Sequence, residues 1–245
     1  MTIHYSIIIP AYNEEDYLAR TLENVVLAMK EQTQQGELIV VDNNSTDRTA
    51  EIARQAGAKL VFESENQIAK ARNAGARQAS GSHLVFLDAD SIISPVLLTA
   101  ALANLDSKRV CAGGARVEFE TRVDVFPQRV LDFWNWYSVK RQTAAGCFVY
   151  CLKKAFDKVG GFPESVYASE EIWLCMALRK WARNNAMEFR IITKYPILTS
   201  DRKLLWYSNT NLVLQSLPIL ICPPLLRVQY FCKHWYRRPE KNKRN

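Results

Sequence analysis

Apolar runs alternate with segments of helical spacing through the first hundred residues, and this alternation constrains the fold more than any other feature. Between the runs, apolar residues recur every three or four positions, as on one face of a helix. Strands that alternate with helices form a parallel sheet with right-handed crossovers. The sequence therefore predicts an α/β fold with a Rossmann-like, mostly parallel sheet flanked by helices. The predicted strands are residues 5–10, 37–42, 59–62 and 84–88, and the predicted helices are residues 18–29, about 45–57, 67–79 and 94 onward.

The second half of the chain is less regular. Residues 110–120 and 147–152 have the pattern of strands, and residues 170–183 have helical spacing. An aromatic cluster at 133–137 is interpreted either as core packing or as a contact for sugar or lipid. Because 48% of the residues are hydrophobic, the chain can form a sizeable core. We expect one domain over residues 1–204, followed by an apolar and then basic extension over residues 205–245.

The extension differs in charge from the rest of the chain. The net charge is +7, and seven basic residues but only one acid follow residue 226. Residues 212–226 are almost entirely apolar, but this run has 15 residues and three prolines, whereas a membrane-spanning helix needs about 20 residues. The extension is therefore interpreted as a contact for an anionic membrane surface, with a solvated tail as the alternative. Nucleic acid is excluded as a partner because no nucleic-acid motif accompanies the charge.

Two features predict a cytoplasmic location. The six cysteines include no CxxC pair, which is typical of thiols kept in a reducing compartment. The N-terminus leads directly into the first predicted strand, without the pattern of a signal peptide. If the extension binds lipid, we expect peripheral contact with the inner face of the membrane.

Polar side chains follow three of the predicted strands, at the edge where an open α/β sheet binds its ligands. Asn13 and Glu14 follow the first strand, and Asp42 is the last residue of the second. Asp88 is the last residue of the fourth strand, and Asp90 follows it. Residues two apart in an extended segment point to the same side. The last two carboxylates can therefore serve one hard cation such as Mg²⁺ or Mn²⁺, which prefers oxygen ligands and bridges phosphates. A solvated turn is the alternative.

Two further groups near this edge have two interpretations each. Asp42 can accept hydrogen bonds from a ribose or a base, or it can cap the following helix. Lys70, Arg72 and Asn73 lie on the helix before the strand that ends at Asp88. A cation on that helix can face a diphosphate, or it can lie on a solvated helix face.

Glu170 and Glu171 form another acidic group, in the first turn of the helix predicted at 170–183. The helix dipole favours acids at this position, so a purely structural role is available. The functional alternative is a general base that removes the proton of an attacking hydroxyl group.

Four motifs in order resemble those of the family 2 glycosyltransferases, which have the GT-A fold. Together they cover about residues 5–175. The resemblance implies an inverting reaction with a nucleoside-diphosphate sugar as donor. It also implies a nucleotide-sugar half over about residues 1–109 and an acceptor half over residues 110–204. The motifs are Ile7–Glu15 (IIIPAYNEE), Val41–Asp47 (VDNNSTD), Ala71–Gly75 (ARNAG) with Phe86–Asp90 (FLDAD), and Gly160–Phe162 (GGF) with Glu170–Glu171.

The resemblance also implies roles for individual residues. One of Glu170 and Glu171 would be the catalytic base, and the sequence leaves open which. Mn²⁺ or Mg²⁺ would be the cofactor. The residues implied for donor and nucleotide binding are Pro10, Ala11, Tyr12, Glu14, Asp42, Lys70 and Asp88, and those implied for the metal are Asp90 and Asp88.

Two departures from the family pattern bear on the activity. Asp42-Asn43-Asn44 stands where the family has Asp-Asp-Gly, so the second acid is missing. The Gln-x-x-Arg-Trp motif of processive polysaccharide synthases is absent, because Gln229–Trp235 has the wrong spacing. We therefore expect transfer of one sugar, from a UDP-sugar, to a hydroxyl acceptor that is a glycan or is linked to a lipid.

Two other classes of protein share parts of this pattern. A sugar-1-phosphate nucleotidyltransferase would have the same sheet and acidic metal site. It would also need a Gly-rich, basic phosphate loop after the first strand, and residues 10–14 are neither. A non-catalytic nucleotide-sugar-binding or membrane scaffold protein would keep the fold but would neither transfer nor hydrolyse the donor.

Overall fold

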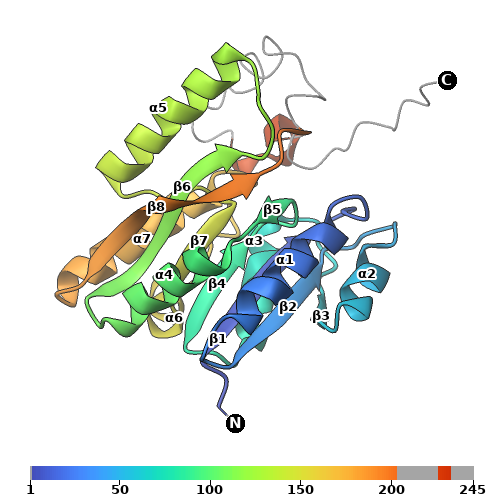
Figure 1. Cartoon of the computed structure of the whole chain (residues 1–245), viewed down its shortest axis with the longest axis horizontal. Helices are drawn as coiled ribbons and strands as arrows, with labels where there is room; N and C mark the ends of the chain where they lie inside the picture. The colour runs from blue at the N-terminus through green and yellow to red at the C-terminus, as the bar shows by residue number, and fades with distance from the viewer. Residues whose placement is uncertain (1, 203–225, 233–245) are drawn as a thin grey trace.

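The computed structural model describes residues 2–202 and 226–232 (Figure 1). Its strands are β1 (Tyr5–Ala11), β2 (Gly36–Asp42), β3 (Lys59–Phe62), β4 (His83–Leu87), β5 (Ser91–Ile92), β6 (Val110–Phe119), β7 (Phe148–Leu152) and β8 (Glu188–Thr199). In the described part of the chain they form one sheet in the order β3-β2-β1-β4-β7-β6-β8-β5. The first four strands in this order are parallel, as are β6 and β8, whereas β7 is antiparallel to both neighbours. The predicted α/β fold with a mostly parallel sheet is confirmed.

Helices cover both faces of the sheet. They are α1 (Leu18–Lys30), α2 (Thr49–Gln55), α3 (Ile68–Gln78), α4 (Pro95–Asp106), α5 (Val125–Arg141), α6 (Lys153–Val159) and α7 (Glu170–Asn184). Figure 1 shows α1, α2 and α4 on one face and α3, α6 and α7 on the other. Helix α5 stands apart from these two layers and packs on β6 and β8.

The chain reverses its direction of travel across the sheet at β1. It proceeds outward from β1 through β2 to β3, and α3 then carries it back to β4 on the other side of β1. Ligands of open α/β sheets bind at such a switch point, beyond the carboxyl ends of the strands. The turn after β1 and the acids after β4 both lie at this point.

Close packing of α3 on β1 determines where α3 lies. Strand β1 is buried at six of its seven residues, as its continuous apolar run predicts. A Cβ atom at Gly75 would lie only 2.4 Å from Ile8 Cγ2. Glycine therefore allows α3 to approach β1 closely, and this approach places Arg72 beside the end of β4.

The structure resolves two local questions that the sequence raised, the start of the second helix and the place of the aromatic cluster. The helix expected from about residue 45 begins at Thr49, because the preceding residues form a turn in which the Ser45 N–H donates to Asp42 Oδ1 at 2.9 Å. The aromatic cluster lies on α5, where Trp134 packs against the core but Phe133 and Trp136 are exposed.

Only a short part of the predicted extension lies among the described residues. It contains the 3₁₀ helix η2 (Gln229–Cys232). Leu226 and Cys232 are buried against Val166 and Ala168, in the loop before α7. The rest of the extension, with most of its apolar segment and its basic tail, lies outside the described residues.

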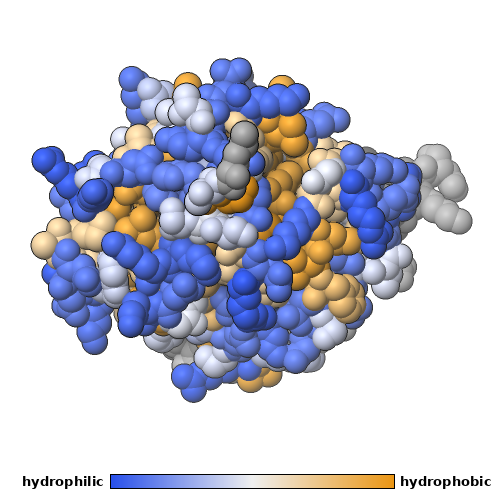
Figure 2. Space-filling view, turned by 90° about the horizontal axis from the view of Figure 1, so that it is seen from below, coloured by the Kyte–Doolittle hydropathy of each residue, from blue (hydrophilic) through white to orange (hydrophobic). Residues whose placement is uncertain are grey.

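The described surface and helices bear on contact with a membrane. Figure 2 shows the lower face of the molecule, where β1 begins, and hydrophilic side chains predominate there around smaller hydrophobic areas. Within the described ranges, no helix combines the length and the apolar character needed to cross a membrane.

Candidate active site

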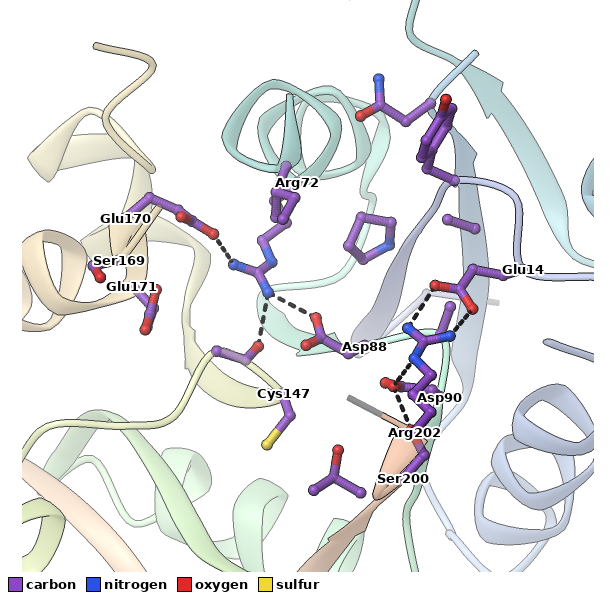
Figure 3. A pocket seen from close by; sticks show the side chains of 18 of the residues that line it. Glu14, Arg72, Asp88, Asp90, Cys147, Ser169, Glu170, Glu171, Ser200 and Arg202 are labelled. Carbon is purple, nitrogen blue, oxygen red and sulfur yellow. Dashed lines mark hydrogen bonds and ion pairs between the residues drawn. The ribbon is translucent and has the colours of Figure 1, made fainter. Parts of the chain in front are cut away.

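A cavity of about 470 Å³ opens at the carboxyl ends of β1 and β4. Figure 3 shows charged side chains from distant parts of the chain converging on it. Among the described residues that line it are six carboxylates and two guanidinium groups: Glu14, Asp88, Asp90, Glu170, Glu171 and Asp201, with Arg72 and Arg202.

Hydrogen bonds tie the turn after β1 to the turn after β2. The Asn13 N–H donates to Ser45 Oγ at 3.0 Å, and Asn13 Oδ1 accepts from the Thr46 N–H at 2.8 Å. Asn13 has a left-handed φ of 51°, which asparagine adopts more readily than most residues. These bonds hold Tyr12 and Glu14 at the wall of the cavity.

Arg72 is the buried cation on one side of the cavity (Figure 3). Its side chain is 3% exposed and donates to Asp88 Oδ1 at 2.7 Å, to Glu170 Oε1 at 2.6 Å and to the Gly146 carbonyl at 2.8 Å. Burial alone would lower the pKa of Arg72, but the charges of Asp88 and Glu170 raise it above its ordinary value. A permanently charged guanidinium group therefore joins α3, the end of β4 and the first turn of α7.

The loop before α7 is held against α3. Asn73 Nδ2 donates to the Phe162 carbonyl and Asn73 Oδ1 accepts from the Phe162 N–H, both at 2.9 Å. Gly161 has a left-handed φ of 74°, and a Cβ atom there would lie 2.7 Å from Asn73 Oδ1. Ser169, just before α7, has a φ of 61°, a conformation that costs about 1–3 kcal/mol. The Gly-Gly-Phe motif thus positions the two glutamates that begin α7.

Those two glutamates have different surroundings. Glu170 is bound to Arg72, whereas Glu171 lines the cavity near Gly146. Burial, and then the negative charge of Glu170, raise the pKa of Glu171 from its ordinary value of 4.5 to about 8. A carboxyl group with a pKa near the working pH is suited to accept a proton from a hydroxyl group. Glu171 therefore has the properties of a general base.

A second guanidinium group, that of Arg202, lies near the turn after β1 (Figure 3). It donates to the two oxygens of Glu14 at 2.5 and 2.8 Å, and its Nε lies 2.9 Å from Asp90 Oδ2. Ser200 Oγ donates to the same Asp90 oxygen at 2.8 Å. Burial alone would lower the pKa of Arg202, but Glu14 and Asp90 raise it.

Asp88 and Asp90 lie in a turn. Strand β4 ends at Leu87, and the Ser91 N–H donates to the Asp88 carbonyl at 3.1 Å. The extended geometry predicted for this pair is therefore wrong. The two carboxylates contact different cations, Asp88 that of Arg72 and Asp90 that of Arg202, yet both line the same cavity.

The charge of the cavity fits a divalent cation. Six carboxylates against two guanidinium groups leave an excess of negative charge, even with Glu171 protonated. An anionic ligand would be repelled unless a cation entered with it. Asp88 and Asp90 offer the oxygen ligands that Mg²⁺ and Mn²⁺ prefer, and these ions commonly combine one or two carboxylates with phosphates of a substrate.

The cavity brings together most of the residues predicted from the sequence. Asp42 and Lys70 are not among its lining residues: Asp42 holds the turn at Ser45, and Lys70 forms an ion pair with Glu65. Arg202 was not predicted, because a single arginine after a strand belongs to no motif and no periodic pattern. The predicted residues that do line the cavity are Pro10, Ala11, Tyr12, Glu14, Arg72, Asp88, Asp90, Glu170 and Glu171.

Comparison with known families agrees with this arrangement. The model of the family described as "Glycosyl transferase family 2" matches residues 6–159, which is more than half of the chain. The chain belongs to this family. One relative is glycosyltransferase AglE of Haloferax volcanii, which is 30% identical over 178 residues. The match covers 68% of this chain and 58% of AglE, so the chain spans less than two thirds of this curated relative.

Solved structures show the same GT-A fold. A glucosyl-3-phosphoglycerate synthase from Mycobacterium tuberculosis, in complex with Mn²⁺, UDP-glucose and phosphoglyceric acid, is similar with a TM-score of 0.65 and 18% identity. The match covers 92% of this chain and 79% of the synthase. The mannosyltransferase PcManGT from Pyrobaculum calidifontis, in complex with GDP-Man and Mn²⁺, has a TM-score of 0.62 and 22% identity, over 94% of this chain and 69% of its own.

Proposed function

We propose that the chain is an inverting, metal-dependent glycosyltransferase that moves one sugar from a UDP-sugar to a hydroxyl acceptor. One observation carries this proposal: a single cavity combines the acidic pair after β4 with a carboxyl group whose pKa is raised to about 8. The first feature suits an anionic donor that binds with a metal ion, and the second suits the activation of an acceptor hydroxyl. Family membership and the Mn²⁺ in the two similar structures support the same assignment.

On the donor side, the turn after β1 would hold the nucleoside through Pro10, Ala11, Tyr12 and Glu14. Asp90 and Asp88 would hold Mn²⁺ or Mg²⁺, which, when bound, offsets the negative charge that develops on the departing diphosphate. Arg202 and Ser200 contact one oxygen of Asp90, so they orient this carboxylate.

On the acceptor side, Glu171 would accept the proton of the acceptor hydroxyl group. The hydroxyl oxygen then forms a bond to the anomeric carbon, while the bond from this carbon to the diphosphate breaks on the opposite face. This displacement inverts the anomeric centre. Arg72 keeps Glu170 paired, which leaves Glu171 as the carboxyl group for proton transfer.

Removal of the metal site tests the donor assignment. Asp90→Asn keeps the size of the side chain but loses its charge, so we expect transfer to fall on the order of 100-fold or more. EDTA is expected to have the same effect on the wild type, and added Mn²⁺ to reverse it. The measurement is nucleotide release from a panel of nucleotide-sugars, with and without EDTA.

The matched control is Asp157→Asn, an exposed acid on α6 that pairs only with Lys153 among the described side chains; it is expected to retain wild-type activity. Full activity of Asp90→Asn, or of the wild type in EDTA, would contradict the metal assignment. Failure of the wild type to release nucleotide from any donor, despite binding one, would instead support a non-catalytic scaffold.

The outward face of α5 supports a lipid-linked acceptor. Val125, Phe126, Val130, Phe133 and Trp136 are each between 51% and 68% exposed, and their spacing places them on one side of the helix. Two cations lie on the same side: Arg129, and Lys140, whose Nζ is 4.9 Å from the centre of the Trp136 ring. An apolar helix face that includes cations suits the interface of an anionic bilayer, because long basic side chains reach the headgroups while apolar ones enter the acyl region.

Vesicle flotation tests this face. The double substitution Phe133→Ser/Trp136→Ser is expected to lower partitioning onto vesicles that contain phosphatidylglycerol by about tenfold or more, since two large apolar groups lose their contact. Trp173→Ser, at a 46% exposed position on α7, is the control and should bind like the wild type. If the double variant floats unchanged while deletion of residues 205–245 abolishes flotation, the extension binds the membrane and α5 does not.

A further inference from the structure

We infer that the chain has a second metal site, a Zn²⁺ site formed by His4, His83 and Asp106, at the end of the sheet opposite to the cavity. His4 lies just before β1, His83 is the first residue of β4, and Asp106 is the last residue of α4. Strand β4 separates His83 from Asp88 by five residues, or about 17 Å at the rise of a strand. The two sites are therefore separate, and this inference does not depend on the proposed transfer reaction.

The three ligand atoms are already close together. His4 Nε2 lies 2.9 Å and His83 Nε2 lies 3.2 Å from the same oxygen, Asp106 Oδ1. All three atoms lie within 4.8 Å of one another. In a tetrahedral zinc site with metal–ligand distances of about 2.0–2.1 Å, neighbouring ligand atoms are about 3.3 Å apart. Only small movements of side chains would be needed to bind the ion.

The hydrogen bonds of His83 show which of its nitrogens is available. Its Nδ1 lies 2.7 Å from Ser82 Oγ, and this hydroxyl donates its only proton to the His4 carbonyl at 3.1 Å. In this arrangement Nδ1 carries the imidazole proton and donates it to Ser82 Oγ. Nε2 consequently presents a lone pair, which is the form of histidine that binds metals.

That lone pair has no partner of its own in the described structure. His83 is 6% exposed, and its Nε2 makes no hydrogen bond within the described residues, although Asp106 Oδ1 is near. A buried polar atom without a partner is costly, and a lone pair that faces a carboxylate is repelled by it. A cation between the two would remove both penalties.

The type of ligand selects the metal. Two imidazoles and one carboxylate suit Zn²⁺, whereas Mg²⁺ and Mn²⁺ prefer sites made of oxygen ligands. The groups around the ligands are also arranged as around metal-bound side chains, since Ser82 contacts the second nitrogen of His83 and Gln34 Nε2 donates to Asp106 Oδ2 at 3.4 Å. His4 and Asp106 are about one third exposed, so water can complete the coordination. The ion would fasten the N-terminus and α4 to β4.

Imidazole NMR tests the site on the chain of residues 1–245 labelled with ¹⁵N-histidine. The chain has three histidines, His4, His83 and His234, so each signal can be assigned by substitution. One equivalent of Zn²⁺ is expected to shift Nε2 of His4 and His83, to leave His234 unchanged, and to raise the melting temperature. EDTA should reverse these effects. This readout is insensitive to metal at the acidic cavity, which has no histidine among its described lining residues.

Substitutions at the two partly exposed ligands complete the test, because they leave the buried His83 in place. His4→Gln and Asp106→Asn are each expected to weaken Zn²⁺ binding, measured by calorimetry, by about 100-fold. His234→Gln is the control and should bind as the wild type does. The inference is overturned if Zn²⁺ leaves the His4 and His83 signals unchanged, or if His4→Gln and His234→Gln bind Zn²⁺ equally well.

Discussion

Glu171→Gln is expected to lower the turnover number for sugar transfer by about 10²- to 10⁴-fold, the range typical for loss of a general base. The amide has nearly the same size as the carboxyl group, but it cannot accept the proton of the acceptor. Donor binding should change little, because Glu171 lies across the cavity from the turn after β1. Steady-state measurement of nucleotide release, with kcat and KM determined separately, distinguishes a chemical defect from a binding defect.

The raised pKa gives this residue a pH signature. Glu171 is active as a base only when ionised, so wild-type turnover should rise as pH increases through about 8. At pH 7 only roughly a tenth of the molecules carry the ionised form. The Gln variant should lack this rise. The pH dependence of stability has the opposite sign. The carboxyl group of Glu171 releases its proton near pH 4.5 in the unfolded chain and near pH 8 in the folded chain. The free energy of unfolding of the wild type should therefore decline as pH rises from 4.5 to 8, and it should decline less in the Gln variant.

Glu170→Gln is the matched comparison at the neighbouring position. It removes the charge that pairs with the buried Arg72, so its main effect should be on stability and on the position of Arg72. Loss of turnover in Glu170→Gln with wild-type turnover in Glu171→Gln would reverse the two roles. Wild-type turnover in both variants would show that neither glutamate is the base.

Sequence pattern predicts the donor half of this fold well, for a physical reason. Strands buried on both faces require continuous apolar runs, and β1, β2 and β4 lie where such runs predict them. Helix α4 likewise begins as Ser94-Pro95 predicts, with Ser94 Oγ accepting from the Leu97 N–H. Since parallel strands end at one edge, the polar residues that follow them had to gather there.

The remaining features depend on contacts that local sequence does not encode. The difference between Glu170 and Glu171 arises because Arg72, which lies 98 positions earlier in the chain, contacts Glu170, whereas Glu171 lines the cavity. Arg202 contacts Glu14 across 188 positions of sequence. The antiparallel place of β7 between β4 and β6 is likewise set by tertiary packing.

Arg72→Met is expected to lower the free energy of unfolding by about 3–5 kcal/mol, the usual cost of removing one partner from a buried ion pair. The loss should come mainly from Glu170, whose side chain is 5% exposed, because Asp88 is 36% exposed and retains water. Arg72→Lys keeps the charge, but an ammonium group lacks the planar fork that reaches three acceptors, so an intermediate loss is expected. Urea denaturation of the purified variants provides the measurement.

The matched control is Arg77→Met on the same helix. Arg77 is 61% exposed, and its nearest carboxylate, that of Glu164, lies 4.0 Å away, so its replacement should change stability by no more than about 0.5 kcal/mol. If Arg72→Met lowers the free energy of unfolding no more than Arg77→Met does, the buried ion pair of Arg72 and Glu170 does not stabilise the fold.

The double variant Arg72→Met/Glu170→Met separates the structural role of Arg72 from its role in the site. It removes both buried charges together, and apolar replacement of a complete buried pair is often neutral or stabilising. We therefore expect the double variant to recover most of the stability that Arg72→Met loses. Transfer should remain impaired, because Asp88 still lacks the guanidinium that holds it at 2.7 Å. Recovery of both stability and activity would show that Arg72 serves the fold alone; recovery of stability without activity places it in the donor site as well.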